Sequence, residues 1–360
     1  MGNESISTGR LIASADDLVL VTGANGFIGS RVVETLLSRG FRNIRCLVRS
    51  ATSKTERLLS IVASYPDARV ELVEGNLKSS RDCAACARDV RLVFHLAAGI
   101  AEKSFPGCFL NTVVTTRNLL DALNETHLLK RFVNVGSMSV YSNLLLKRRH
   151  AVDETCPLEQ DHMSRSEPYA YAKLKQDELV IDYATRHKFS YVILRPGAVY
   201  GPGKPDVTGR VGIGTFGLFL HLGGRNRIPF THVKNCADAI VHAGLSADAD
   251  GQVFNVIDDD VPTSRQFMAG YVKHVEPMKY LSVPYPIFYL FCHLWESHSR
   301  WSEGQFPPVF NRRRCAAYWK GNHYSNQKLK ALTGWRPKLS FADAAPEYYA
   351  YLRKNRAASC

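Results

Sequence analysis

The stretch Leu18-Val-Leu-Val-Thr-Gly-Ala-Asn-Gly-Phe-Ile-Gly29 decides the fold. Its apolar run from Leu18 to Val21 predicts a buried strand, and the Gly-x-x-Gly-x-x-Gly spacing after it predicts a tight turn into a helix. Gly23 allows the turn, Gly26 lets backbone approach a pyrophosphate, and Gly29 lets the helix pack against the sheet. Because a helix N-terminus favours negative charge, we expect the phosphates of a dinucleotide there. A plain strand–helix turn is the alternative.

The residue after the second predicted strand, Ile44–Val48, bears on which dinucleotide binds. Enzymes that prefer the unphosphorylated form usually have a carboxylate there, which holds the ribose hydroxyls. Here the strand ends in Arg49, which would attract a 2′-phosphate, with Arg31 as a second cation. We therefore expect NADP(H), with NAD(H) as the alternative if Arg49 only stacks on the adenine.

A second motif, Tyr169-Ala-Tyr-Ala-Lys173, lies far downstream. A phenol is a poor base at neutral pH, with an ordinary pKa of about 10. Lys173 stands four residues after Tyr169 and therefore on the same helix face, where its positive charge favours the phenolate. The pair predicts proton transfer to a carbonyl or from an alcohol. Tyr171 is a rival phenol, but it faces another side of the helix.

A hydroxyl is expected to hold the substrate oxygen. Ser137 follows the fifth predicted strand, at the edge of the sheet where ligands bind in parallel α/β folds. We assign it this hydrogen bond and place Ser139 second, as a substrate contact. The alternative is that both hydroxyls only cap local backbone.

Short apolar runs alternate with helical patterns through the first part of the chain, which predicts a parallel sheet covered on both faces. The fold class is α/β, a doubly wound (Rossmann) sheet of about seven strands with a smaller, mixed C-terminal lobe. Strands are predicted at residues 18–21, 44–48, 70–73, 92–96, 132–135, 191–194 and 253–256. Helices are predicted at 27–38, 112–126 and 167–187, and a strand followed by a helix at 230–245.

The domain boundaries follow from this pattern. Residues 1–16 are predicted to be a disordered tail. Residues 17–196 form the dinucleotide-binding domain, to which 231–261 return. Residues 197–230, which are rich in glycine, and 262–355 form the substrate-binding lobe.

Composition excludes several classes of protein. The formal net charge of the 360 residues is +13, but the basic residues are spread out and lack interleaved aromatics, so nucleic acid is not expected as a partner. No apolar run has membrane-spanning length; the longest, Tyr285–Trp295, contains His293. Core packing is the preferred role of its aromatic residues, and an apolar pocket or peripheral contact with a membrane are the alternatives.

The cysteines indicate a reducing compartment. Nine cysteines without a secretion signal suggest free thiols in the cytoplasm. Cys83-Ala-Ala-Cys86 has the spacing of a metal or redox site, but no second pair follows. We interpret it as a structural thiol pair on a helix and predict no metal site.

Taken together, these motifs resemble those of the extended short-chain dehydrogenases/reductases. This superfamily contains the nucleotide-sugar epimerases and dehydratases and the 3β-hydroxysteroid dehydrogenases. The resemblance runs from about Leu18 to Tyr351. It rests on the glycine and tyrosine–lysine motifs and on FHLAAG (94–99), NVGSMSVYS (134–142), LRPGAVYGPG (194–203), THVKNCADA (231–239) and TGWRP (333–337).

The resemblance implies a seventh parallel strand and further site residues. Asn111 should stand in the helix that supports a water relay to Lys173, and Pro196-Gly197 should border the nicotinamide. The expected cofactor contacts are Gly23, Asn25, Gly26, Phe27, Ile28, Gly29, Arg49, Asn76, Leu77, Leu96, Ala97, Ala98, Gly99, Tyr169, Lys173, Pro196, Gly197 and Val199. Relatives commonly form homodimers through four helices, here 112–126 and 167–187 with their copies.

Two segments depart from the family pattern. Gly75-Asn76-Leu77 stands where Gly-Asp-Leu is common, and Val140-Tyr141-Ser142 stands where Val-Tyr-Gly is common. Neither change removes a reacting group, so activity is still expected.

Three hypotheses for function remain at this point. The first is a ketoreductase or secondary-alcohol dehydrogenase acting on a lipid-, sterol- or polyketide-like molecule. The second is a nucleotide-sugar epimerase or dehydratase, and the third is a non-catalytic dinucleotide-binding sensor. Sugar-nucleotide relatives often hold the diphosphate with an arginine at the position where this chain has Ile228, and its absence favours the first hypothesis. Two observations favour the second hypothesis instead. Arg225 and Arg227 are close to that position, and Arg312-Arg313-Arg314 lies in the lobe where sugar-nucleotide relatives place a second phosphate-binding arginine. Tyr200 is also assigned to the substrate.

Overall fold

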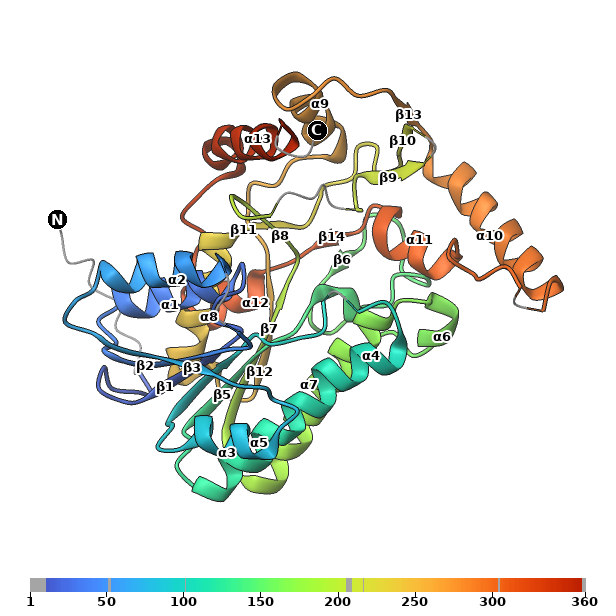
Figure 1. Cartoon of the computed structure of the whole chain (residues 1–360). Helices are drawn as coiled ribbons and strands as arrows, with labels where there is room; N and C mark the ends of the chain where they lie inside the picture. The colour runs from blue at the N-terminus through green and yellow to red at the C-terminus, as the bar shows by residue number, and fades with distance from the viewer. Residues whose placement is uncertain are drawn as a thin grey trace.

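A seven-stranded parallel sheet forms the centre of the protein. The structure, a computed structural model, describes residues 11–50, 53–100, 102–204, 209–215, 217–303 and 305–357. The strand order is β3-β2-β1-β4-β5-β7-β12 (Figure 1). The strands are β1 (Val19–Thr22), β2 (Asn43–Val48), β3 (Arg69–Glu74), β4 (Leu92–His95), β5 (Arg131–Val135), β7 (Ser190–Pro196) and β12 (Gln252–Val256). The predicted fold class and all seven predicted strands are confirmed.

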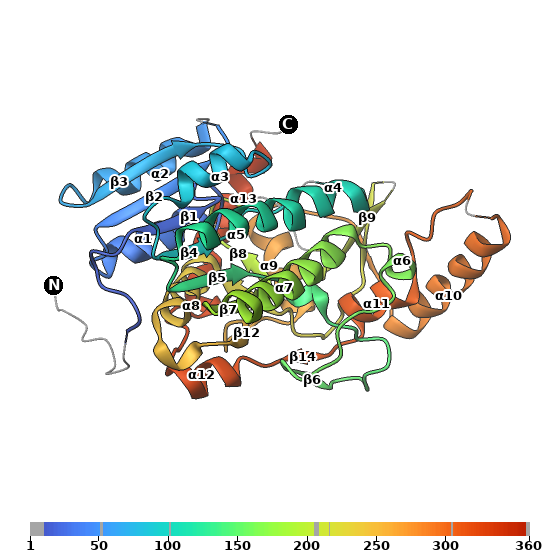
Figure 2. The same cartoon turned by 90° about the horizontal axis from the view of Figure 1, so that it is seen from below.

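Helices cover both faces of this sheet, because its central strands are buried on both sides (Figures 1 and 2). One face packs on residues of α1 (Gly29–Ser38), α2 (Ser53–Ala63), α8 (Val233–Leu245) and α12 (Gln327–Thr333). The other packs on α3 (Ser80–Ala87), α5 (Thr115–Thr126) and α7 (Pro168–His187). Cys83 and Cys86 lie buried on α3, which confirms the predicted helix.

The helix predicted at 112–126 begins earlier than predicted. α4 (Phe105–Phe109) leads through a π-helical turn, η1 (Leu110–Val114), directly into α5. The sequence Phe-Pro-Gly suggests a break, but proline is tolerated in the first helical turn and the Ser104 side chain accepts a hydrogen bond from Gly107 N. The π turn inserts one extra residue into the helix, next to Asn111.

The rest of the chain builds smaller elements above the carboxyl edge of the sheet. Small sheets are formed by β8 (Ala198–Tyr200) with β11 (Phe230–His232), by β9 (Gly212–Thr215), β10 (Leu218–His221) and β13 (Tyr280–Ser282), and by β6 (Ala151–Val152) with β14 (His323–Tyr324). The remaining helices are α6 (His162–Arg165), α9 (Ser264–His274), α10 (Tyr285–Trp301), α11 (Arg312–Trp319) and α13 (Phe341–Ala357), with the short turns η2 (Met138–Val140) and η3 (Ala247–Ala249). The division into two domains stays a prediction.

Part of the stretch predicted as a disordered tail packs on the body. Residues 1–10 lie outside the described residues. Leu11 forms an isolated bridge with Ser246, and Ala13 is buried in the main core. The backbone bridge at Leu11 and the burial of Ala13 hold this stretch against the body of the protein.

The aromatic run from Tyr285 forms α10, and core packing describes only one of its faces. Phe288 and Cys292, four residues apart, are buried, whereas Ile287, Leu290 and Leu294 are exposed. The period of the helix sends the two sets to opposite sides. Within the described residues, no helix combines the length and apolarity that crossing a bilayer requires.

Candidate active site

The glycine turn between β1 and α1 has the geometry that its sequence predicts. Gly23 has φ of +65°, and its carbonyl accepts a hydrogen bond from Gly26 N at 2.9 Å. A Cβ on Gly29 would lie 2.1 Å from the Gly23 oxygen, and a Cβ on Gly26 would lie 3.0 Å from the same atom. Only glycine fits at Gly29, and the bare backbone leaves the N-terminus of α1 open to a phosphate.

A cleft of about 410 Å³ opens beside this turn. It is built from the carboxyl ends of β1, β2, β3 and β4 and the start of the helix after β4. Among the residues predicted to bind the cofactor, its lining includes Gly23, Asn25, Gly26, Arg49, Asn76, Leu77, Leu96, Ala97 and Ala98, and it also includes Asn111. A dinucleotide fits this cleft, because the cleft lies at the carboxyl edge of the sheet, next to the glycine turn, and has Arg49 in its lining.

The other predicted cofactor residues surround this cleft without lining it. Phe27 lies under Gly203, Ile28 and Gly29 open α1, and Gly99 packs against Asn111. Arg31 pairs with Glu34 at 2.5 Å rather than joining Arg49 in the cleft lining. Pro196 ends β7, Gly197 packs against the Pro229 carbonyl, and Val199 lies in β8.

Tyr169 and Lys173 lie on one side of α7, and the Tyr169 phenol meets Ser137, which follows β5. The Ser137 side chain shares a hydrogen bond with the Tyr169 phenol, which lowers the pKa of that phenol, but burial dominates and raises it to about 12. The Ser139 hydroxyl donates to Ser137 Oγ at 2.9 Å. A protonated phenol beside a fixed hydroxyl is the arrangement that donates a proton to a carbonyl oxygen.

Lys173 is fully enclosed beneath the reacting phenol. Its ammonium donates to Val135 O and to Gln176 Oε1, each at 2.8 Å. Burial lowers the pKa of Lys173 to about 8, against the opposing charge of Asp177. The fixed ammonium brings a positive charge to the site at neutral pH.

From Gln176 a chain of buried hydrogen bonds runs along the α5 and α7 face of the sheet to the glycine turn. Gln176 Nε2 donates to Thr116 Oγ1 at 2.8 Å, and Thr116 Oγ1 lies 2.9 Å from His95 Nε2. His95 Nδ1 lies 2.9 Å from Thr22 Oγ1, which accepts from the N–H groups of Leu96 and Ala97. The lysine side chain and the cofactor cleft are thus joined by one network.

The hydrogen bonds of this network fix the tautomer of His95. Thr116 Oγ1 donates to Thr112 O, so it accepts from Nε2 of His95. Thr22 Oγ1 is occupied as an acceptor, so its proton points to Nδ1. His95 therefore has no room for a second proton, and burial together with the Lys173 charge lowers its pKa to about 3.

This histidine should make the protein sensitive to acid. Its pKa in the folded protein lies below the unfolded value of about 6.5, so its contribution to stability is complete above pH 6.5 and is lost as pH falls toward 3. At pH 5 the loss should be about 2 kcal/mol. We expect His95→Asn to flatten the change in unfolding free energy between pH 7 and pH 5 by this amount, measured by urea unfolding. An identical pH dependence in both proteins would contradict the assigned protonation.

A second buried network contains the charged groups next to Tyr169 and Lys173. The Asp177 carboxylate accepts from Asn134 Nδ2 at 2.9 Å and from Arg195 Nε at 3.0 Å. Arg195 also donates to the Tyr141 hydroxyl at 3.2 Å. Burial raises the pKa of Asp177, and the cations Arg195 and Lys173 oppose this. The Asp177 carboxylate also attracts the Lys173 ammonium, which opposes the lowering of the pKa of that lysine by burial.

Sequence reasoning missed this supporting set: His95, Thr116, Gln176, Asp177 and Arg195. A charged residue inside the apolar run of β7 and a carboxylate one helical turn after Lys173 were the available signals for Arg195 and Asp177. Nothing in the sequence relates Thr116 to His95, because the contact depends on how α5 packs on β4.

Asn111 has partners on the cofactor side of the site. Its amide donates to Glu102 Oε1 at 2.9 Å and to Gly107 O at 3.0 Å, within the π-helical stretch. The hydrogen bonds of Lys173 go to Val135 and Gln176 instead. The water relay between Asn111 and Lys173 stays a prediction.

Three of the residues that the sequence assigned to the substrate have surroundings that do not include Tyr169 or Lys173. Tyr200 is buried in an aromatic cluster with Phe230 and Tyr348, which indicates a packing role. Arg225 and Arg227 are exposed, and Arg227 lines a separate cavity of about 450 Å³ with Asp258. Ser139 alone lies beside the reacting groups.

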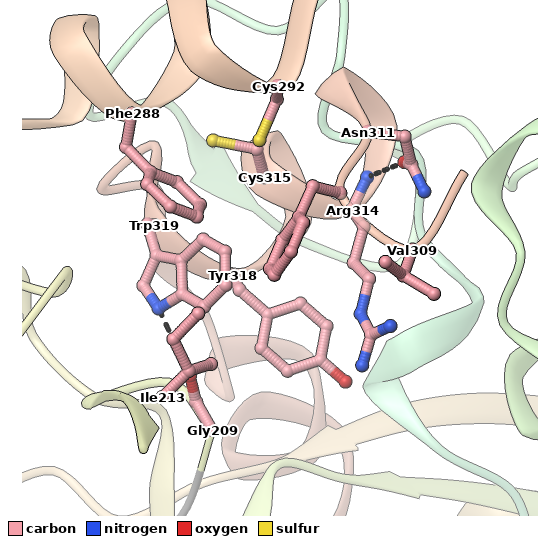
Figure 3. Close-up of a pocket in the computed structure, with 11 residues that line it drawn as sticks. Gly209, Ile213, Phe288, Cys292, Val309, Asn311, Arg314, Cys315, Tyr318 and Trp319 are labelled. Carbon is pink, nitrogen blue, oxygen red and sulfur yellow. Dashed lines mark hydrogen bonds between the residues drawn. The ribbon is translucent and has the colours of Figure 1, made fainter. Parts of the chain in front are cut away.

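A further cavity, of about 130 Å³, lies between α10 and α11 (Figure 3). Its walls are mainly apolar and aromatic: Ile213, Phe288, Cys292, Val309, Phe310, Cys315, Tyr318 and Trp319. Arg314 and Asn311 are its polar lining residues, and the Trp319 indole donates to Gly209 O. The Tyr318 hydroxyl donates to Glu167 Oε1 at 2.5 Å, and Glu167 directly precedes α7, two residues before Tyr169.

The three arginines that open α11 differ in their partners. Arg312 pairs with Glu296 at 2.6 Å, and Arg313 pairs with Glu159 at 2.9 Å and Asp161 at 3.1 Å. Arg314 extends along the cavity wall, with its guanidinium carbon 6.0 Å from the centre of the Tyr318 ring. It is the cation of this triplet that a bound anion could reach.

Comparison with known proteins identifies the family of this chain. Residues 19–256 match the model of the NAD dependent epimerase/dehydratase family. The chain belongs to that family. It is an enzyme of the extended short-chain dehydrogenase/reductase superfamily, as its motifs predicted, and the family depends on NAD-type dinucleotides.

Curated relatives of this epimerase/dehydratase family member differ in substrate. A sterol-4-alpha-carboxylate 3-dehydrogenase, decarboxylating, from Mus musculus is 24% identical over 93% of this chain and 92% of its own length. A UDP-glucose 4-epimerase from Vibrio cholerae is 26% identical over 77% of this chain and 82% of its own length. Both identities are low, so they fix the superfamily and leave the substrate open.

Solved structures support the fold. A UDP-glucuronic acid 4-epimerase from Bacillus cereus, in complex with NAD, has a TM-score of 0.70 and 22% identity over 93% of this chain and 96% of its own. The structure of gox2253 has a TM-score of 0.73 and 22% identity over 94% of this chain and 99% of its own. At these identities the likeness concerns the fold alone.

Proposed function

We propose that this enzyme transfers a hydride between a nicotinamide dinucleotide and a secondary alcohol or ketone on an apolar, lipid-, sterol- or polyketide-like molecule. The observation that carries the chemistry is the hydrogen bond between the Tyr169 phenol and Ser137, with Lys173 one helical turn away and anchored to Val135 O. When bound, the nicotinamide supplies or accepts the hydride.

Ser137, Tyr169 and Lys173 each have a separate task. Ser137 holds the substrate oxygen by a hydrogen bond, beside the Tyr169 phenol. Tyr169 gives its proton to that oxygen during reduction and takes it back during oxidation. Lys173, held by Val135 O and Gln176, places positive charge near the phenol, so that the phenolate formed after proton donation is stabilised.

The substrate class rests on the cavity between α10 and α11. A cavity of about 130 Å³ is comparable with one of ~150 Å³ that holds a benzene ring. Its aromatic walls favour an apolar ring or chain, and its link through Tyr318 to Glu167 ties it to the helix of Tyr169. Arg314 at the wall suits a substrate that also carries one anionic group.

The test of this proposal compares two substrate classes. The purified enzyme is given NADPH or NADH with a panel of apolar ketones, and in parallel with UDP-sugars. The proposal predicts loss of nicotinamide absorbance in step with formation of alcohol from a ketone. Turnover of UDP-sugars without net absorbance change, together with no reaction of any ketone, would overturn it.

A nucleotide-sugar epimerase or dehydratase is the second candidate, and Arg314 is the observation that favours it. A guanidinium on a cavity wall lined with aromatic rings could bind a diphosphate while a uracil or sugar packs on the rings. Retention of UDP or dTDP by the purified protein would favour this candidate. Recovery without nucleotide would favour the apolar substrate.

We further propose that Arg49 gives a preference for NADP(H). Arg49 is exposed at the end of β2 and lines the dinucleotide cleft, where a 2′-phosphate would meet it. Hydrogen bonds to charged groups contribute about 1.5–3 kcal/mol, which is roughly 10- to 100-fold in affinity. Arg49→Asp should shift the ratio of NADPH to NADH affinity toward NADH by this factor, measured by titration calorimetry.

The matched control for this prediction is Arg69→Asp. Arg69 is also exposed but begins β3, at the opposite edge of the sheet. The same change of charge there should leave the ratio intact. An unchanged ratio in Arg49→Asp would refute the role of Arg49.

A further inference from the structure

Helix α10 carries an apolar stripe that no element of the described chain covers. The stripe consists of Ile287, Leu290, Phe291, Leu294 and Trp301, whose residues are 60%, 56%, 41%, 60% and 79% exposed. Their spacing places them along one side of the helix, opposite the buried Phe288 and Cys292. Figures 1 and 2 show α10 projecting from the body, on the side away from α1 and α2. Five large apolar side chains along one projecting helix indicate an interaction surface.

Exposed cations lie next to the first turn of this helix. Lys147, Arg148 and Arg149 are all exposed, and the guanidinium carbon of Arg148 lies 5.7 Å from the centre of the Tyr285 ring. None of these three cations forms an ion pair within the part of the chain that the structure describes. Leu145, which is 91% exposed, precedes them and lines a hollow together with Tyr289 of α10.

The acidic side chains near the stripe do not cancel this charge. Glu296 is paired with Arg312, and Glu303, at the end of the helix, is accompanied by the exposed Arg300. The whole chain carries a formal charge of +13. An anionic surface is therefore attracted to this part of the protein, whereas the same basic surface of a second copy is not.

We propose that α10 and the Lys147–Arg149 run form a docking surface for an anionic lipid bilayer. The stripe would lie in the interface with its apolar side chains among the acyl chains, and the cations would contact lipid phosphates and carboxylates. The opposite face of α10 supplies Phe288 and Cys292 to the cavity of Figure 3, so one helix separates the lipid surface from the cavity. The docking does not depend on the identity of the substrate.

The experiment measures how the full chain partitions onto vesicles. Phosphatidylcholine vesicles are compared with vesicles that contain phosphatidylserine as well, by co-sedimentation. We expect binding to the anionic vesicles and much weaker binding to the neutral ones. Trp301 should then show a blue shift of its emission, because its ring leaves water.

Two variants separate the apolar and ionic parts of the surface. Leu290→Glu with Leu294→Glu should lower the partition coefficient on anionic vesicles at least tenfold. Lys147→Glu with Arg148→Glu should remove the preference for anionic over neutral vesicles. The matched control is Leu59→Glu with Leu332→Glu, which changes two exposed leucines on α2 and α12 and should leave partition unchanged.

Dinucleotide binding by each variant verifies that it is folded. Absence of binding to anionic vesicles, or equal loss in the control and the stripe variants, would overturn the proposal. The proposal would also be overturned if the parent protein did not bind vesicles and the stripe variant had a lower oligomeric mass than the parent by light scattering. That result would mean that a second copy of the chain covers the stripe.

Discussion

Tyr169→Phe should lower turnover by about 10²- to 10⁴-fold while leaving dinucleotide affinity nearly unchanged. The variant keeps the ring, and with it the packing of α7, but removes the proton that the substrate oxygen needs. The pKa of this phenol is raised to about 12 by burial, so the wild-type group is protonated and ready to donate at neutral pH. Steady-state kinetics and cofactor titration measure the two quantities separately.

Tyr171→Phe is the matched control for this variant. The ring of Tyr171 packs against Phe105, Phe109 and His162 on another side of α7. Removal of its hydroxyl should leave turnover within about twofold of wild type, since the account gives it no chemical role. Activity retained in Tyr169→Phe and lost in Tyr171→Phe would reverse the assignment.

Asp177→Ala should destabilise the protein by about 3–5 kcal/mol, because it leaves the Arg195 guanidinium buried without its carboxylate. Asn134 would lose a partner as well. The loss should appear as a lower midpoint of urea unfolding. It should also lower the pKa of Lys173, since Asp177 is the group that raises it.

A double variant distinguishes the charge pair from simple packing. Asp177→Ala with Arg195→Met should lose less stability than the sum of the two single variants, because both members of the pair are gone. Asp177→Asn keeps the shape and should fall between wild type and Asp177→Ala. A loss below about 1 kcal/mol in Asp177→Ala would mean that the pair does not hold the site together.

The seven strands could be predicted from sequence because a doubly covered parallel sheet needs continuous apolar runs. β4 and β5 illustrate this, since all their residues are buried. The start of the helix at Phe105 could not be predicted from the sequence, because Pro106 and Gly107 suggest a break and the π-helical turn has no local sequence signature. Which face of α10 is buried also depends on tertiary packing, so the exposed stripe was not predictable.

Part of the candidate site could likewise be predicted from the sequence, and part could not. Gly23, Gly26, Tyr169 and Lys173 were predictable because their spacing itself has a physical purpose. His95 and Gln176 were not, because each acts through a partner more than 20 residues away, Thr116, and the contact is made only when β4, α5 and α7 pack. The residues proposed to bind the substrate were least predictable, since Tyr200 lies in a buried aromatic cluster and the proposed substrate cavity is built by α10 and α11.

Transfer of labelled hydride tests the central claim most directly. The enzyme is incubated for a single turnover with nicotinamide dinucleotide deuterated on the reactive face and with an apolar ketone that turns over in the substrate panel, and the products are analysed by mass spectrometry. The account predicts one deuterium on the carbinol carbon of the product alcohol and none when Tyr169→Phe is used. Alcohol without deuterium, or deuterium appearing only in a sugar nucleotide supplied in place of the ketone, would contradict it.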